Sequence, residues 1–150
     1  MTDINIDDFF KDAAKTLVQL YKTFPRRHGV FVDEIYGTEE LDEYGMHSER
    51  YLACFGTLIW LGEEGFLRYA DTIRYDAIDQ AVLTARCFTQ LCAPATSLEP
   101  MDVTDLPTSV RIEKSTNIHG LENAVKERSS ARVRSAMLDL MKAMESGSSR

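Results

Sequence analysis

The chain has 150 residues, of which 44% are hydrophobic and 27% are charged, and its formal net charge is −7. This length fits one domain, or a small domain with an appendage, and the composition excludes an intrinsically disordered protein. No apolar run approaches the roughly 20 residues that cross a bilayer, and the N-terminus lacks the basic and apolar regions of a signal peptide. We therefore expect a cytoplasmic protein with no membrane partner.

The negative charge is unevenly distributed along the chain. Residues 1–92 hold 9 Lys and Arg against 16 Asp and Glu, whereas residues 93–150 hold 8 of each kind. Because neutralisation of phosphates by Lys and Arg supplies most non-specific DNA affinity, this distribution disfavours DNA as a partner. A local basic patch could still outweigh the net charge.

The first predicted elements are a helix and a short strand. Apolar residues recur at steps of three and four from Ile6 to Phe24, which predicts a helix over about residues 6–23 that ends before Pro25. The β-branched and aromatic run Val30-Phe31-Val32 predicts a brief strand. Between these two elements lies a basic cluster of Lys22, Arg26, Arg27 and His28.

An acidic segment follows the predicted strand. Residues 33–49 contain no Lys or Arg and seven acids, namely Asp33, Glu34, Glu39, Glu40, Asp42, Glu43 and Glu49. Gly37 and Gly45 bracket a short predicted helix that Thr38 would cap. We expect the basic cluster to pair with these acids, since charges of both signs this close usually neutralise each other.

A long apolar helix and a hairpin come next. Ser48 is a favourable N-cap for a helix that runs to Glu64, is buried on most sides and stops at Gly65. Residues 66–73 and 81–83 predict two paired strands, with residues 74–79 as the turn. Thr84 then suits the N-cap of a short helix over residues 85–91, and Pro94 ends this unit.

The remaining chain predicts a linker and a second helical segment. Residues 93–114 contain three prolines and indicate a linker or extended arm. Residues 115–145 predict two helices, the second capped by Ser129 or Ser130, and residues 146–150 a frayed tail. The second helix carries an apolar stripe that must pack on its own domain, on a second copy or on a partner, and it is a candidate interaction surface: Val133, Met137, Leu140, Met141 and Met144.

The order of elements over residues 6–92 resembles the winged helix-turn-helix fold. The most specific segment runs from Leu61 to Leu67, with Ala81-Val82-Leu83-Thr84 about fifteen residues later, and is similar to a run found in many bacterial winged-helix proteins. The resemblance implies an α+β fold that is mostly α, with a small hairpin and, in this chain, a C-terminal helical arm. It also implies that the helix over residues 48–64 occupies the position of a recognition helix.

If the winged-helix role holds, five side chains are candidate nucleic-acid contacts: Arg26, Arg27, Arg50, Arg68 and Arg74. Apart from Ser48, Glu49, Arg50 and Thr57, however, the helix that would enter the major groove is largely apolar, and it follows the acidic segment. Fold does not imply function, so this departure weakens the customary role of the fold.

No catalytic or metal-binding motif is apparent. The three cysteines do not form a disulfide framework, and Cys54 lies in an apolar run where a thiol packs as a small hydrophobe. His47 among acids could ligate a metal, but a solvated loop histidine is the commoner arrangement. We find no nucleophile elbow or phosphate-binding glycine loop, and we expect neither catalysis nor a cofactor.

Two functions from different classes remain. The first is a non-catalytic protein-interaction or accessory module of winged-helix type that associates with itself as a homodimer or with another protein. Deletion of residues 115–150 should then lower the oligomeric mass or abolish partner capture. The alternative is a DNA-binding transcriptional regulator that uses the helix over residues 48–64 and the hairpin over residues 66–83.

Overall fold

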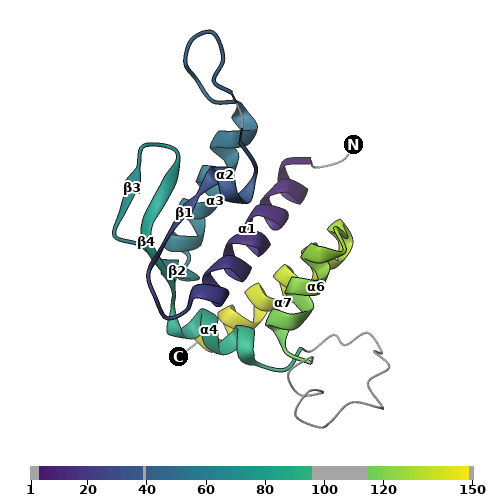
Figure 1. The fold of residues 1–150 in the computed structure, drawn as a ribbon. Helices are drawn as coiled ribbons and strands as arrows, with labels where there is room; N and C mark the ends of the chain where they lie inside the picture. Colours follow the sequence, from purple (N-terminus) through teal and green to yellow (C-terminus); the bar gives the residue numbers. More distant parts are fainter. Residues whose placement is uncertain (1–3, 39, 96–114, 149–150) are drawn as a thin grey trace.

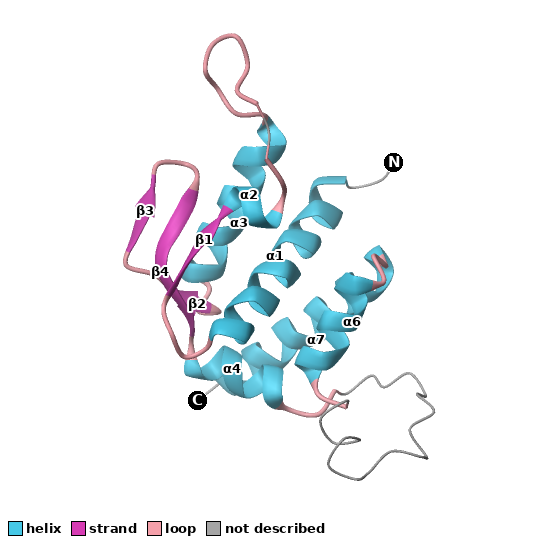
Figure 2. Ribbon diagram, viewed as in Figure 1, coloured by secondary structure: helices cyan, strands magenta, loops and turns pink. Residues whose placement is uncertain are grey.

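The computed structural model describes residues 4–38, 40–95 and 115–148, and they form a mostly-α α+β fold, as predicted (Figure 1). Within these ranges six helices accompany a four-stranded antiparallel sheet (Figure 2). The helices are α1 (Ile4–Thr23), α2 (Val32–Ile35), α3 (Glu49–Glu63), α4 (Ala85–Cys92), α6 (Asn117–Lys126) and α7 (Ser130–Ser148). The strands are β1 (His28–Phe31), β2 (Leu67–Arg68), β3 (Asp71–Ile73) and β4 (Ala77–Leu83).

Helix α1 is the centre of the structure. It contacts α3 and the sheet on one side and α6 and α7 on the other (Figure 1). Small and branched apolar side chains cover more than one face of this helix, and four of them are buried: Ala13, Ala14, Leu17 and Leu20. A helix apolar on more than one face has to be covered on more than one side.

Strand β4 organises the sheet. It pairs with β1 on one edge, while β2 and β3 pair in succession with its other edge, Leu67 opposite Leu83 and Ile73 opposite Ala77. The second strand of the hairpin therefore begins at residue 77 rather than at the predicted residue 81. Ala77 and Ile78 are fully buried, and this burial extends the strand into the predicted turn.

The predicted helix ends of α3 and α4 are confirmed. The Ser48 Oγ accepts a hydrogen bond from the Tyr51 amide at 3.1 Å, and the Thr84 Oγ1 accepts one from the Cys87 amide at 3.2 Å. Gly65 ends α3 with a φ of +82°, a conformation that L side chains rarely adopt.

The predicted short helix between Gly37 and Gly45 is wrong. The short helix is α2, which begins immediately after β1 because Val32 and Ile35 are the buried positions. The 13 residues from 36 to 48 then connect α2 to α3. A DNA-binding helix-turn-helix joins its two helices by a turn of about three or four residues, so this connection departs from that motif.

The C-terminal helices belong to the same core as the rest of the chain. Helix α7 packs on α1, α4 and α6. One cluster of buried apolar side chains includes Phe10 of α1 and Met144 of α7. The two ends of the segment over residues 96–114 meet, since the Ala95 amide donates to the Ser115 carbonyl oxygen at 2.7 Å. Residues 96–114 of the predicted linker lie outside the described residues.

Two expectations for the C-terminal segment are corrected. The stripe predicted as an interaction surface is covered by this chain itself: Val133, Met137, Leu140 and Met144 are buried and Met141 is half-buried. The predicted frayed tail is helical as far as Ser148, and residues 149–150 lie outside the described part. The Ser129 Oγ accepts from the Arg132 amide at 3.3 Å, so Ser129 caps α7.

Substitution of Met137 tests this shared core. Met137→Ala should lower the free energy of unfolding by about 2–5 kcal/mol, since a fully buried side chain is lost, whereas Lys142→Ala, an exposed position on α7, should leave it nearly unchanged. Urea unfolding followed by fluorescence of Trp60, the single tryptophan, in α3, measures both. An unchanged Trp60 transition for Met137→Ala would show that α7 is not part of this core.

Candidate functional site

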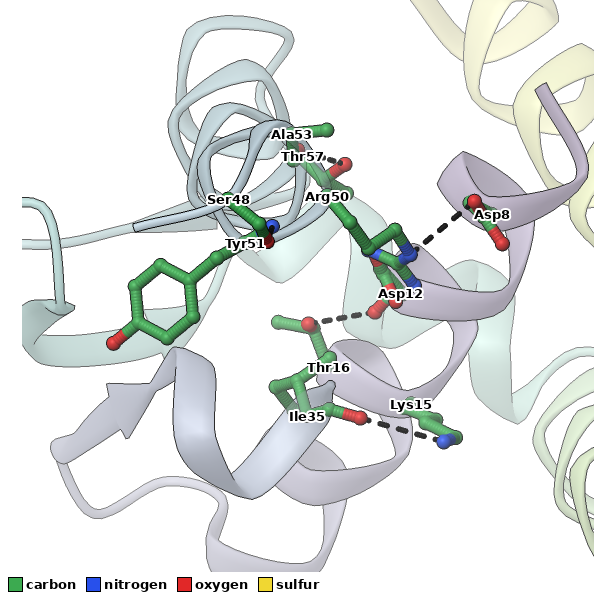
Figure 3. A network of polar contacts seen from close by, with 10 residues as sticks. All are labelled: Asp8, Asp12, Lys15, Thr16, Ile35, Ser48, Arg50, Tyr51, Ala53 and Thr57. Carbon is green, nitrogen blue, oxygen red and sulfur yellow. Dashed lines mark hydrogen bonds and ion pairs between the residues drawn. The ribbon is translucent and has the colours of Figure 1, made fainter. Parts of the chain in front are cut away.

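Arg50 joins α3 to α1 through a charged cluster (Figure 3). Its guanidinium donates to both carboxylate oxygens of Asp12, at 2.7 and 2.8 Å, and its Nε lies 3.2 Å from Asp8. The Tyr36 ring lies 4.5 Å from the guanidinium carbon. The hydrogen bonds to Asp12 raise the pKa of Arg50. An arginine paired in this way has fewer donors for a phosphate, and this pairing weighs against the prediction of Arg50 as a nucleic-acid contact.

The other four predicted contacts are exposed but do not form one surface. Arg26 and Arg27 lie between α1 and β1, and Arg68 lies on β2 opposite Val82, towards the same end of β4. Arg74 follows β3 at the other end, about 17 Å away along the strand at 3.3 Å per residue. The structure therefore brings Arg26, Arg27 and Arg68 towards one end of the sheet and separates Arg74 from them.

The expected pairing of the basic cluster with the acidic segment is not observed. Among the described residues, no carboxylate lies within ion-pair distance of Lys22, Arg26 or Arg27. The polar link between these segments runs instead through Gln19, whose side-chain nitrogen donates to Glu34 at 2.8 Å and lies 3.1 Å from the His28 ring.

The exposed face of α3 offers no basic donor. Its solvent-facing residues are acidic, apolar or small: Glu49, Leu52, Ala53, Gly56 and Glu63. Direct recognition of bases in the major groove depends mainly on Arg, Lys, Asn and Gln. This helix therefore presents a surface unlike that of a recognition helix.

The connection between α2 and α3 projects from the body of the protein and ends in an ordered tip (Figure 2). One oxygen of Asp42 accepts hydrogen bonds from the amides of Tyr44 and Met46, each at 2.9 Å. Gly45 allows the tight turn with a φ of +74°. This turn presents Leu41, Tyr44 and Met46 to solvent, and Tyr44 is 79% exposed.

The base of the projecting loop is anchored on α3 and the hairpin. The His47 ring stacks on Tyr51 with a centroid distance of 3.7 Å, and its Nε2 lies 3.0 Å from the Asp76 carboxylate. The buried Tyr51 hydroxyl donates to the same Asp76 oxygen at 3.0 Å. Burial and then Asp76 raise the pKa of Tyr51, so this hydroxyl stays a donor at neutral pH.

Around this anchor lies what we term the acidic face: residues 33–38 and 40–49 together with Leu52 and Tyr75. Tyr75 belongs to it because its ring packs edge-on against Phe55 of α3 at 5.7 Å. The sequence of residues 33–49 carries the entire excess charge of −7, since the other 17 Asp and Glu are matched by 17 Lys and Arg. Exposed aromatic and apolar side chains thus lie among unneutralised carboxylates.

The described residues hold no group of three or more His, Cys, Asp and Glu side chains that could bind a metal ion. None of the described helices is long and apolar enough to cross a membrane. Cys54 and Cys87 are buried, as predicted for Cys54, and burial raises the pKa of both thiols to about 12. Cys92 is exposed.

Comparison with known proteins adds no relative. No family model matches the chain, and no curated protein or solved structure matches it either.

The exposed apolar tip of the loop is not among the features predicted from the sequence. Its signal was present, because Leu41, Tyr44 and Met46 interrupt a run of acids that has no helical or strand periodicity. A large apolar side chain in such a segment has no core to join, and its exposure follows.

The Asp12–Arg50 pair should dominate the stability of the α1–α3 contact. Asp12→Asn should cost about 3 kcal/mol, because it leaves a half-buried guanidinium without its charged partner. Asp8→Asn removes a more exposed partner of the same arginine and should cost less than about 1 kcal/mol. Urea unfolding of the two variants makes the comparison, and equal costs would contradict it.

Thiol reactivity should separate the three cysteines. At pH 8 a thiol with a pKa of about 12 is thiolate in about one molecule in ten thousand, so Cys54 and Cys87 should react with an aromatic disulfide reagent only on unfolding. One fast equivalent is expected in native protein and none in Cys92→Ser. Two or three fast equivalents would show that the α1–α3 or the α4 core opens readily.

Proposed function

We propose that the chain is a non-catalytic protein-interaction module of winged-helix type, and that its acidic face binds a partner protein with a basic surface. The exposure of Tyr44 on an ordered, projecting turn is the observation that carries this proposal. Tyr and Met are enriched in the cores of protein interfaces, where one or two aromatic anchors supply most of the binding energy.

The internal contacts of residues 42–51 support binding. The Asp42 turn and the stacking of His47 on Tyr51 hold the tip before any partner arrives. Less conformational entropy is then lost on association, and more of the contact energy is expressed as affinity. A cation–π contact with an incoming Lys or Arg is available to the Tyr44 ring.

The charge of the face favours a different protein over a second copy of this chain. Two acidic faces brought together would repel, and the stripe expected to mediate a homodimer, with Met137 at its centre, is buried in this chain's own core. A Lys- and Arg-rich partner would be steered towards residues 33–49 at long range, with an association rate that falls as salt rises.

DNA binding is the second candidate. The exposure of Arg26, Arg27 and Arg68 near one end of the sheet favours it, whereas the exposed side chains of α3 oppose it. A gel shift at low salt with Arg68→Ala separates the two functions. Duplex retained by the wild-type chain and released by Arg68→Ala would favour the DNA-binding function.

Affinity capture with the immobilised full chain tests the proposed face. A bound protein should be released by Tyr44→Ala/Met46→Ala, with affinity about 30-fold lower, and by raised salt, because an aromatic anchor and its charged surroundings are lost. Ile4→Ala, which alters an exposed apolar residue outside the face, is the matched control and should retain it. Both variants should unfold like the wild type.

Capture that is equal for the wild type and the Tyr44→Ala/Met46→Ala variant would contradict the assignment of this face. A second comparison uses two double variants. Glu40→Gln/Glu43→Gln removes two charges of the acidic face, and Glu63→Gln/Glu64→Gln removes two exposed charges at the far end of α3. Equal salt dependence of partner capture by these two variants would also contradict the assignment.

A further inference from the structure

A cleft of about 560 Å³ opens between α1 and the turn that joins α6 to α7. Four of the side chains that line it are cationic, namely Lys11, Lys15, Lys126 and Arg128, and Asp7 is the one acid among its lining residues. We term this the cationic cleft. A cluster of this sign stands out in a chain whose net charge is −7.

Cations outnumber acids among the residues that line the cationic cleft. No described carboxylate lies within ion-pair distance of Lys11, Lys126 or Arg128. Asp7 faces Arg134 on α7, with 3.7 Å between its carboxylate oxygen and the guanidinium nitrogen. The cleft therefore gathers four cations around a carboxylate that already has a partner, which favours a bound anion.

The environment of Lys15 shows the effect of this excess of cations. Its ammonium donates to the Ile35 carbonyl oxygen at 3.3 Å, and it is partly buried. Burial first, and then repulsion by Lys11, lower the pKa of Lys15. Lys11 and Lys15 are four residues apart on α1 and so lie on one face of that helix, where like charges destabilise each other. An anion between them would remove this repulsion.

Arg128 occupies a backbone position that glycine would satisfy better. It follows α6 with a φ of +55°, its amide donates to Val125 at 3.1 Å, and the Ser129 amide donates to Ala124 at 3.3 Å. These two hydrogen bonds define the Schellman end of a helix, whose left-handed residue is usually glycine. An arginine held there is unfavourable for the backbone alone, which indicates a use for its side chain.

We propose that the cationic cleft binds a small anion of the phosphate class that carries at least two negative charges. The start of the 19-residue helix α7 opens on the same cleft at Ser129 and Ser130, and its dipole adds partial positive charge. Val125 and Val133 line the cleft as well and suit an apolar group attached to the phosphate. The volume lies in the usual range for small-molecule sites.

This site shares no lining residue with the acidic face and contacts it at the hydrogen bond from Lys15 to Ile35. Its residues come from α1, α6 and α7. Helices α6 and α7 lie on the side of α1 away from α3 and the sheet (Figure 1), whereas the Lys15 ammonium reaches the Ile35 carbonyl oxygen of α2. Loss of anion binding would therefore leave the proposed protein interaction untouched, and the converse also holds.

Calorimetric titration of the full chain with pyrophosphate, phenyl phosphate and sulfate tests the proposal. Binding of pyrophosphate or phenyl phosphate is expected, together with shifts of the Lys126–Ser130 amide signals in NMR spectra. Tighter binding of pyrophosphate would indicate an oligophosphate ligand, and tighter binding of phenyl phosphate a phosphate ester with an apolar part. Absence of binding by both, or equal binding of sulfate, would overturn the proposal.

Two variants locate the site. Lys11→Gln/Lys126→Gln should weaken binding at least about 10-fold, since two charged contacts are lost, whereas Lys142→Gln on α7, outside the cleft lining, should not. Arg128→Gly should weaken binding while raising the Tm by about 3 °C, because glycine relieves the left-handed backbone. A stabilised Arg128→Gly that binds like the wild type would overturn the role of Arg128.

Discussion

Every other element is arranged around the burial of α1 on more than one side. Ala13 and Ala14 let neighbouring elements approach closely, and Leu17 and Leu20 fill the space between them. Asp12 is 1% exposed, and its bidentate pairing with Arg50 lets a charged group lie in this interface and ties α3 to the helix. A buried carboxylate is tolerated only when it is paired and hydrogen-bonded, so the position of α3 and the charge of Arg50 depend on each other.

The same arrangement keeps two surfaces of opposite charge apart. The acidic face extends from the α3 side of α1, where residues 33–49 carry all the excess negative charge. The cationic cleft lies on the other side, where Lys11 and Lys15 of α1 meet Lys126 and Arg128. Salt screens the attraction between charges that lie further apart than the Debye length, which is about 8 Å at physiological ionic strength. Each surface can therefore attract its own ligand.

Local chemistry in the sequence predicted most of the fold. The apolar repeat of α1, the caps at Ser48 and Thr84 and the stop at Gly65 each depend on neighbours within a few residues, and all are confirmed. Long-range partners were not predictable in this way. Asp12 and Arg50 are 38 residues apart, so neither local segment predicts that they pair. The sequence around Met137 predicts an apolar stripe but does not indicate what covers it. The packing of α7 on α1 shows that other helices of the same chain cover this stripe.

We infer that α1 unites α3, the sheet and the C-terminal helices in one cooperative unit. Native-state hydrogen exchange in increasing sub-denaturing urea tests it most directly. The slowest amides of α1, α3 and α7 should converge on one opening free energy equal to that of global unfolding. If the amides of α6 and α7 exchange through a separate opening whose free energy is at least about 2 kcal/mol below that of α1, the C-terminal helices are not part of one cooperative unit.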